Sequence, residues 1–335
     1  MIKKILLLLT IVMAGLNVIY SQTAGQGKPS EVISSRHYKK LGLLDGHPDP
    51  SRAWLDTISY PARENATSTL VATKLRTVYL VSDVSTLLNI PLPPANSSEQ
   101  TRAELDFLLE LQEKRTPQEV ERYQKLAGIF HSPNNFNPYD KDYDRNFSSL
   151  FHVGSPLGEW YTYKNLPVTA QLLSDAYRDA TYYFFNLKVQ VARARPYMLE
   201  PKLKNLERPP HASYPSGHSA ASYVNAYIMM EIAPGLTNEF LQMAAEMAYS
   251  REVLGVHYPS DSEVSRIWAR SFVNELLKTE KFRQDLEKVK KEISEKQKAV
   301  KKSSSTIKTT GGCESSCNSS CSSSCNSESS CCNNN

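Results

Sequence analysis

The chain has 335 residues, of which 40% are hydrophobic and 22% charged, and its formal net charge is +4. These proportions are typical of a globular protein, and the small net charge excludes the dense basic surface of a nucleic-acid-binding protein. The length fits one large domain or two smaller ones.

The N-terminal segment has the order of a secretory signal peptide. It begins MIKK, continues with an apolar run over residues 5–18 and ends in small residues at 21–24. The apolar run is short for a membrane span. We therefore expect residues 1–21 to be a signal peptide and the protein to be periplasmic or secreted, with an uncleaved anchor helix as the alternative. No later apolar run is long enough to cross a bilayer, so we expect no stable membrane insertion after cleavage.

The next segments are predicted to be an extended arm followed by two helices. Residues 22–66 are rich in Pro, Gly and turn-forming residues, so we expect an arm with little regular structure. Ser97 or Ser98 is a good N-cap for a helix over residues 99–112, where Leu recurs near helical spacing. A second helix is expected over residues 116–130, with a proline at its first position.

The remaining chain predicts an all-α core. Residues 131–157 are rich in Asn, Pro, Asp and Tyr and are expected to be a long loop. Helical periodicity then recurs in four segments, which are residues 166–193, 216–232, 238–256 and 261–277. No βαβ alternation or hairpin series is visible, so we predict a compact multi-helix bundle as a domain over residues 67–278.

The C-terminal region differs in composition from the core. Residues 279–302 are dense in Lys and Glu and predict an exposed helix held by side-chain charge pairs. Residues 303–335 are dominated by Ser, Asn and Cys, and we expect them to be disordered. All six cysteines of the chain lie in this tail. Their C-x-x-x-C spacing suits soft-metal binding, crosslinking or modification, and an unstructured appendage is the alternative.

The first of three polar motifs is KVQVARARP, which contains Lys188 and Arg195. The two cations are seven residues apart, close to two helical turns, so they are expected to project from one face of a helix that Pro196 helps to end. Taken alone, the pair also fits two solvated cations on an exposed face.

The second motif, ASYPSGHS, directly precedes an apolar helical run. A helix N-terminus offers unpaired N–H groups, Gly217 allows an anion to approach the main chain, and Ser216 adds a hydroxyl. His218 then stands within reach of a bound anion. The alternative is a capped helix start with an incidental histidine.

The third motif, SREVLGVHYPSD, contains Arg251, His257 and Asp261. Pro259 interrupts the preceding helix, which leaves His257 at a junction. Asp261 is expected to bind one imidazole nitrogen and leave the other as an oriented nucleophile. The alternative is an N-cap aspartate beside a satisfied core histidine.

Together, the order KxxxxxxRP, PSGH and SRxxxxxHxxxD resembles the tripartite signature of the type 2 phosphatidic acid phosphatase superfamily. ASYPSGHS is similar to the GSYPSGHT stretch of bacterial class A nonspecific acid phosphatases, with Ala212 and Ser219 as departures. The upstream segment PLPPANSSEQTRAELDFLLELQEKRT also resembles the start of those enzymes, so the likeness spans residues 80–277. It implies the helical fold shared by acid phosphatases and vanadium haloperoxidases.

The resemblance also implies a role for each motif residue. The phosphate oxygens would be held by three cations, a hydroxyl and a backbone amide, which are those of Lys188, Arg195, Arg251, Ser216 and Gly217. His257 would attack phosphorus to form a phosphohistidine, and Asp261 would orient it. His218 would protonate the leaving alcohol and then act as base towards water. No cofactor and no metal site are expected, and a mildly acidic pH optimum is predicted for phosphomonoester hydrolysis.

Three alternatives remain open. Vanadate-dependent haloperoxidases resemble this family, but the 18 residues at 197–214 between the first two motifs are a compact spacing that we associate with phosphatases. A lipid phosphate phosphatase would thread the motifs between transmembrane helices, which are missing from this sequence. A binding or attachment role would reside in the cysteine-rich tail. Relatives often form oligomers, so a homo-oligomer is compatible with the resemblance, although no stripe in the sequence identifies an interface.

Overall fold

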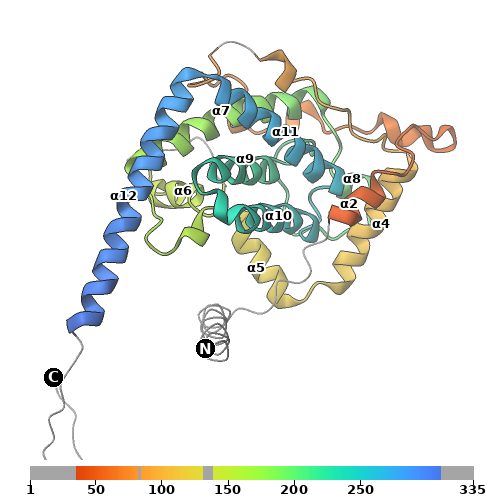
Figure 1. Cartoon of the computed structure of the whole chain (residues 1–335). Helices are drawn as coiled ribbons and strands as arrows, with labels where there is room; N and C mark the ends of the chain where they lie inside the picture. Colours follow the sequence, from red (N-terminus) through yellow and green to blue (C-terminus); the bar gives the residue numbers. More distant parts are fainter. Residues whose placement is uncertain (1–34, 82–83, 131–138, 311–335) are drawn as a thin grey trace, which may run out of the picture. The chain divides into compact units, whose positions relative to one another are not determined.

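The computed structural model describes residues 35–81, 84–130 and 139–310 (Figure 1). In this part of the chain there is no β-strand, and an isolated bridge joins Ser59 to Arg193. The all-α prediction is therefore confirmed. The helices are α2 (Ser35–Leu41), η1 (Pro50–Thr57), η2 (Ala62–Glu64), α3 (Thr67–Ala72), η3 (Ser85–Leu87), α4 (Glu99–Lys114), α5 (Pro117–Ala127), α6 (Tyr143–Leu150), η4 (Ser155–Leu157), α7 (Pro167–Val191), α8 (Pro196–Leu199), α9 (Gly217–Ile232), η5 (Pro234–Leu236), α10 (Thr237–Val253), α11 (Pro259–Lys278) and α12 (Glu280–Thr310).

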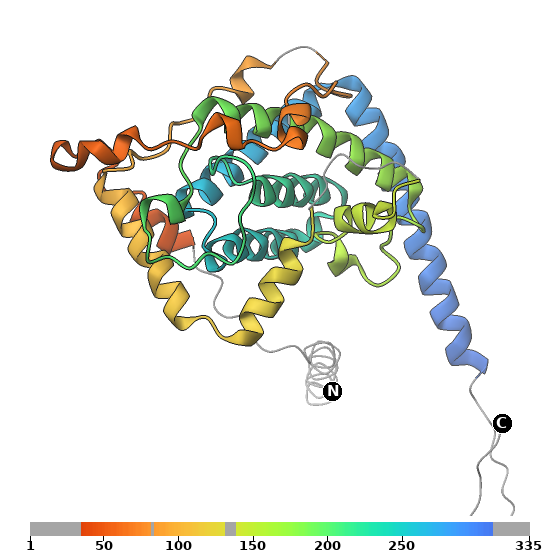
Figure 2. The same cartoon turned by 180° about the vertical axis from the view of Figure 1, so that it is seen from behind.

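Helix α9 is the central element of the bundle. It packs against α7, α10 and α11, and Figure 2 shows it from behind with α10 beside it. Every residue from Ser219 to Met229 is buried, which is the pattern of a helix covered on all sides. Small residues such as Ala220, Ala221 and Ala226 let the neighbouring helices approach closely. The N-terminus of this buried helix, where the second motif lies, is thereby fixed in the core.

The starts of α4 and α5 follow the predicted capping chemistry. The Ser98 hydroxyl accepts a hydrogen bond from Thr101 N at 3.1 Å. Thr116 and Glu119 form a reciprocal capping box, and Pro117 occupies the first helical position. Both helices therefore begin where the local sequence predicts.

Two segments are more regular than predicted. The described part of residues 22–66 contains α2, η1 and η2, so the expectation of little regular structure there is wrong. Long-range contacts hold this arm: Asp56 accepts hydrogen bonds from Ser97 N at 2.9 Å and from Ser97 Oγ at 2.6 Å. Helix α6 lies within the predicted loop 131–157, where Asn225 Nδ2 donates to Leu150 O at 3.3 Å. Tertiary contacts decide the conformation of both segments.

The start of α12 is buried, although an exposed helix is predicted over residues 279–302. Phe282, Leu286, Val289 and Ile293 are each at most 5% exposed and recur at four, three and four residues. This spacing puts them on one helix face, which packs against the core. The chain divides into two compact units after Ile293, so the first unit extends past the predicted boundary at 278.

Several predicted features fall at the chain ends. The predicted signal peptide and the residues after 310, with all six cysteines, lie outside the described residues. Residues 303–310, predicted to be disordered, form the end of α12 in the second compact unit. Across the described ranges, no helix combines the length and the apolarity that a bilayer crossing requires.

Candidate active site

Lys188 and Arg195 do not share a helix face, because α7 ends between them. Ala192 adopts a left-handed conformation with φ of 51°, and its carbonyl accepts a hydrogen bond from Tyr60 N at 2.8 Å. Arg195 therefore lies beyond the end of α7, at the residue that precedes α8. The prediction of two cations on one helix is wrong. The chain turn at Ala192 brings Arg195 to the site from a different direction.

Lys188 lies in the last turn of α7 and is fully buried. Its Nζ donates hydrogen bonds to the carbonyls of Ala212 at 3.0 Å, Ser213 at 3.2 Å and Pro215 at 2.5 Å. These contacts join the first motif to the second. Burial, together with the positive charge of Arg195, lowers the pKa of the Lys188 ammonium well below its usual value.

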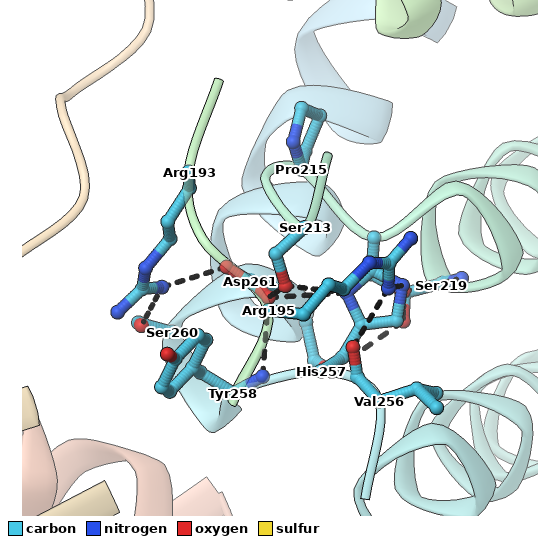
Figure 3. Close-up of polar contacts among 12 residues, drawn as sticks. Arg193, Arg195, Ser213, Pro215, Ser219, Val256, His257, Tyr258, Ser260 and Asp261 are labelled. Atoms are coloured by element: carbon cyan, nitrogen blue, oxygen red, sulfur yellow. Dashed lines mark hydrogen bonds and ion pairs between the residues drawn. The ribbon is translucent and has the colours of Figure 1, made fainter. Parts of the chain in front are cut away.

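The guanidinium of Arg195 lies against the third motif (Figure 3). Its Nη1 donates to Val256 O at 2.7 Å and lies 3.0 Å from His257 Nε2. Its other contacts are with His211, through the backbone carbonyl and through the ring. Burial lowers the pKa of Arg195 to about 10, and it remains a cation at physiological pH.

His257 and Asp261 make the contact expected from their four-residue spacing. His257 Nδ1 lies 3.0 Å from Asp261 Oδ2, and both side chains are almost completely buried. Burial, followed by the charge of Arg195, lowers the pKa of His257 well below its usual value, so the imidazole is neutral. Because Arg195 can only donate, Nε2 of His257 is the acceptor and Nδ1–H donates to Asp261. The lone pair of the ring therefore lies on Nε2.

Asp261 is itself held by further donors. Its Oδ2 accepts from Ser213 Oγ at 2.5 Å and from Tyr258 N at 3.1 Å, and its Oδ1 lies 2.6 Å from Arg193 Nη1. Although burial alone would raise the pKa of Asp261, Arg193 and the His257 contact hold it well below its usual value. The carboxylate therefore stays ionised and keeps His257 in one orientation.

The start of α9 lies beside Lys188. Ser216 is the N-cap, and its hydroxyl accepts from Ser219 N at 3.4 Å. A Cβ at Gly217 would lie 3.7 Å from Lys188 Cε, so the backbone here faces the ammonium stem. His218 turns towards α5, where its Nε2 lies 3.0 Å from Ala127 O. The structure thus places Ser216 and Gly217 beside Lys188 and gives His218 a contact on another helix.

Arg251 is buried at the end of α10 and is only partly neutralised. Its Nη2 donates to Glu207 Oε2 at 2.6 Å, whereas Nε and Nη1 are buried and have no hydrogen-bond partner in the described structure. Its positive charge contributes to the lowered pKa values of Lys188 and Arg195, which places the three cations within electrostatic range of one another. Buried N–H groups of a cation without a partner indicate a site for an anion.

The motif region matches a known protein family. Residues 171–285, which contain all three motifs, match the PAP2 superfamily. The matched region is similar to the PAP2 superfamily and covers about a third of the chain.

Curated proteins similar to this chain are named acid phosphatases. The non-specific acid phosphatase of Salmonella typhi is 27% identical over 190 residues, which are 54% of this chain and 75% of that protein. The non-specific acid phosphatase of Providencia stuartii is 34% identical over 88 residues, and the match spans 26% of this chain and 36% of that protein. A solved bacterial vanadium-dependent iodoperoxidase is similar with 19% identity and a TM-score of 0.45, covering 59% of this chain and 54% of that one.

Several residues that contact the three motifs were not predicted from the sequence. They are Glu104, Arg193, Glu207, His211 and Ser213. Arg193 stands within the first motif and Ser213 within the second, so proximity to motif residues was an available signal for both. Glu104 lies in α4, within the upstream segment that resembles the start of acid phosphatases but outside the three motifs, so no motif indicated it.

The described residues also contain a separate cavity and no metal cluster. A cavity of about 690 Å³ has Gly128, Arg145, His152 and Tyr161 among its lining residues and includes none of the predicted site residues. Its lining includes Lys125 and Gly128, which flank Ala127, the partner of His218. Within the described ranges, no group of three or more His, Cys, Asp and Glu side chains is placed to hold a metal ion.

Proposed function

We propose that this protein is a secreted acid phosphatase that hydrolyses phosphomonoesters through a phosphohistidine on His257, without a metal ion. One observation carries the proposal. Lys188 and Arg195 are buried cations that pair with no carboxylate in the described structure, and Arg195 contacts the free nitrogen of an oriented, neutral imidazole. Uncompensated buried charge is costly, so its presence supports a role in binding an anion.

The phosphate oxygens would accept hydrogen bonds from the three buried cations Lys188, Arg195 and Arg251. Arg251 contributes its buried Nε and Nη1, and Lys188 and Arg195 contribute charge from α7 and from the segment before α8. A preorganised donor aimed at developing negative charge is worth about 3 to 4 kcal/mol in the transition state. Three such cations can therefore supply the charge stabilisation that metal ions supply elsewhere.

His257 is suited to the nucleophilic step. Asp261 accepts from Nδ1–H, which leaves the Nε2 lone pair to form a bond to phosphorus while the bond from phosphorus to the ester oxygen breaks. In the structure Arg195 donates to that lone pair at 3.0 Å. Substrate binding would move this N–H from Nε2 to a phosphate oxygen, so one group both holds the anion and exposes the nucleophile.

His218 would act first as the general acid and then as the general base. It would transfer a proton to the oxygen of the leaving alcohol, and then accept one from the water that breaks the P–N bond and releases phosphate. In the structure its Nε2 contacts Ala127 O at 3.0 Å, so His218 would exchange this contact for the substrate. The same imidazole would thus end the cycle in its starting protonation state.

The pH dependence follows from the histidines. His257 must be neutral to attack, and its lowered pKa keeps it neutral in mild acid. Activity should fall at low pH as His257 becomes protonated, and at high pH as the acid His218 loses its proton. We expect a mildly acidic optimum, and activity that rises steadily past pH 9 would contradict it. The curated relatives named acid phosphatases support this expectation.

The test is hydrolysis of p-nitrophenyl phosphate by the purified protein, with and without a chelator. We expect turnover that the chelator leaves intact and that His257→Ala abolishes. His47→Ala is the matched control, because the His47 side chain is 91% exposed and belongs to none of the three motifs. Loss of activity with chelator would overturn the metal-free mechanism. Peroxide-dependent iodide oxidation in the presence of vanadate, with no phosphate release, would identify an oxidoreductase instead.

A further inference from the structure

His211 is the main side-chain contact of Arg195 besides His257. Arg195 Nε donates to His211 O at 3.0 Å, and Arg195 Nη2 lies 2.9 Å from His211 Nδ1. A guanidinium can only donate, so Nδ1 of His211 must be the acceptor. His211 is therefore neutral, with its proton on the other ring nitrogen.

The guanidinium of Arg195 is thus held between two imidazoles. On one side its Nη1 contacts Val256 O and His257 Nε2, and on the other side Nε and Nη2 contact His211. In the described structure no carboxylate forms an ion pair with Arg195. Its orientation consequently depends on neutral acceptors, and His211 provides two of them.

The surroundings of His211 preserve its role as an acceptor. Burial, followed by the charges of Lys188 and Arg195 and a smaller effect of His257, lowers the pKa of His211 well below its usual value. The Phe185 ring packs edge-on against the imidazole at 5.3 Å between centroids and limits its rotation. Ala212 O lies 3.3 Å from Nδ1 and would accept a hydrogen bond only from a protonated Nδ1, but burial and the two cations outweigh this effect and keep the ring neutral in mild acid.

We infer that His211 is a positioning residue, which holds the Arg195 guanidinium in the plane that serves both the bound phosphate and His257. This inference rests on the proposed function, because it assigns His211 to the same anion site. His211 itself would touch neither the phosphorus nor the reacting oxygen.

The test compares two substitutions that differ in the acceptor. His211→Leu removes the acceptor at similar bulk, whereas His211→Asn places an amide oxygen near the position of Nδ1. We expect the Leu variant to bind inorganic phosphate about tenfold or more weakly than the wild type. Its kcat/KM for p-nitrophenyl phosphate should fall by a similar factor. The Asn variant should recover most of this loss. His47→Asn is the matched control and should equal the wild type.

A second readout reports on Arg195 directly. In histidine-labelled protein, NMR titration should show a higher pKa for His257 in the Leu variant, because Arg195 no longer stays against Nε2, and a pKa near the wild-type value in the Asn variant. If the Leu variant does not fold, His211→Gln replaces it, since its longer side chain moves the acceptor away from Nη2.

The outcomes separate the inference from the proposed function. Equal phosphate affinity in the wild type and the Leu variant, or equal losses in the Leu and Asn variants, would overturn the positioning role. Phosphate binding without hydrolysis in the wild type would overturn the proposed activity while the comparison of His211 variants still decides the inference. A wild type that binds no phosphate would overturn both.

Discussion

Arg193 and Arg195 are two residues apart, both are buried, and their surroundings are opposite. Arg193 forms ion pairs with Asp261 at 2.6 Å and Glu104 at 3.4 Å and lies over the Tyr258 ring. Arg195 contacts two carbonyls and two imidazoles. Despite burial, the two carboxylates raise the pKa of Arg193, whereas burial lowers that of Arg195 to about 10.

The difference distinguishes a structural cation from a cation that can bind substrate. The charge of Arg193 is neutralised inside the fold, where it keeps Asp261 ionised and so orients His257. Under the proposed function, the charge of Arg195 binds the phosphate anion of the substrate. Burial and sequence motif alone do not separate these two roles, because both arginines belong to the same ARAR run. The groups that contact each guanidinium do separate the two roles, because Arg193 contacts carboxylates whereas Arg195 contacts neutral acceptors.

The largest effect is expected on folding stability when Arg193 is changed. Arg193→Met leaves Asp261 and Glu104 buried without their cation, and should lower the free energy of unfolding by about 3 to 5 kcal/mol. Urea unfolding of the wild type and the variant measures this difference in the free energy of unfolding. Arg266→Met, which breaks a half-exposed pair with Glu263, is the control and should cost at most about 1 kcal/mol. Equal costs for both changes would refute the assignment of Arg193 as a buried structural cation.

The next largest effect separates the two arginines by activity. Arg195→Met should lower kcat/KM for an aryl phosphate by about 10²- to 10³-fold, because a donor to the transition state is lost. Its free energy of unfolding should stay unchanged or rise, since an uncompensated buried charge is removed. A stability loss as large as that of Arg193→Met, with activity retained, would reverse the proposed roles.

Glu252 extends the comparison to a buried carboxyl group that pairs with no cation in the described part of the chain. Its Oε1 accepts from Tyr38 at 2.8 Å. Burial raises its pKa to about 8, although hydrogen bonds from Tyr38 and Ser262 act in the opposite direction. Because the pKa is raised from 4.5, the folded state is most stable in acid and loses stability as the pH rises from about 5 to about 8. Glu252→Gln should therefore unfold at a similar urea concentration at pH 5 and pH 8.5, whereas the wild type loses roughly 3 to 4 kcal/mol of unfolding free energy. Parallel losses in both proteins would contradict the assignment.

The smallest effect concerns the hydroxyl that links the carboxylate network. Ser260 Oγ accepts from Arg193 Nη1 at 2.8 Å and donates to Glu104 Oε2 at 2.8 Å. Ser260→Ala should lower the free energy of unfolding by about 1 kcal/mol and change kcat/KM little. A large loss of activity with unchanged stability would place Ser260 on the substrate side of the comparison instead.

Local chemistry explains which elements could be predicted. The helices that begin after Ser98 and Thr116 start with side-chain caps that involve residues three positions apart, so the sequence contains the whole signal. The contact of His257 with Asp261 also depends on a short spacing. These features required no knowledge of distant residues.

The features that were missed depend on distant partners. Helix α7 ends at Ala192, a non-glycine residue with positive φ, where Tyr60 N donates to its carbonyl from more than a hundred residues upstream. The partner of Arg193 in α4, Glu104, has no sequence relation to the motifs. The burial of Val289 and its neighbours in α12 likewise requires the core that they cover. Tertiary contacts decide all three, and a single sequence does not contain them.

A crystal structure of the protein with orthovanadate tests the central claim most directly. The account predicts a trigonal-bipyramidal vanadate with vanadium bonded to His257 Nε2 and its oxygens within hydrogen-bond distance of Lys188, Arg195 and Arg251. Arg195 should have moved its Nη1 from Nε2 to an oxygen, while its contact with His211 remains. Vanadate bound elsewhere, with Arg195 still against His257, would contradict the account.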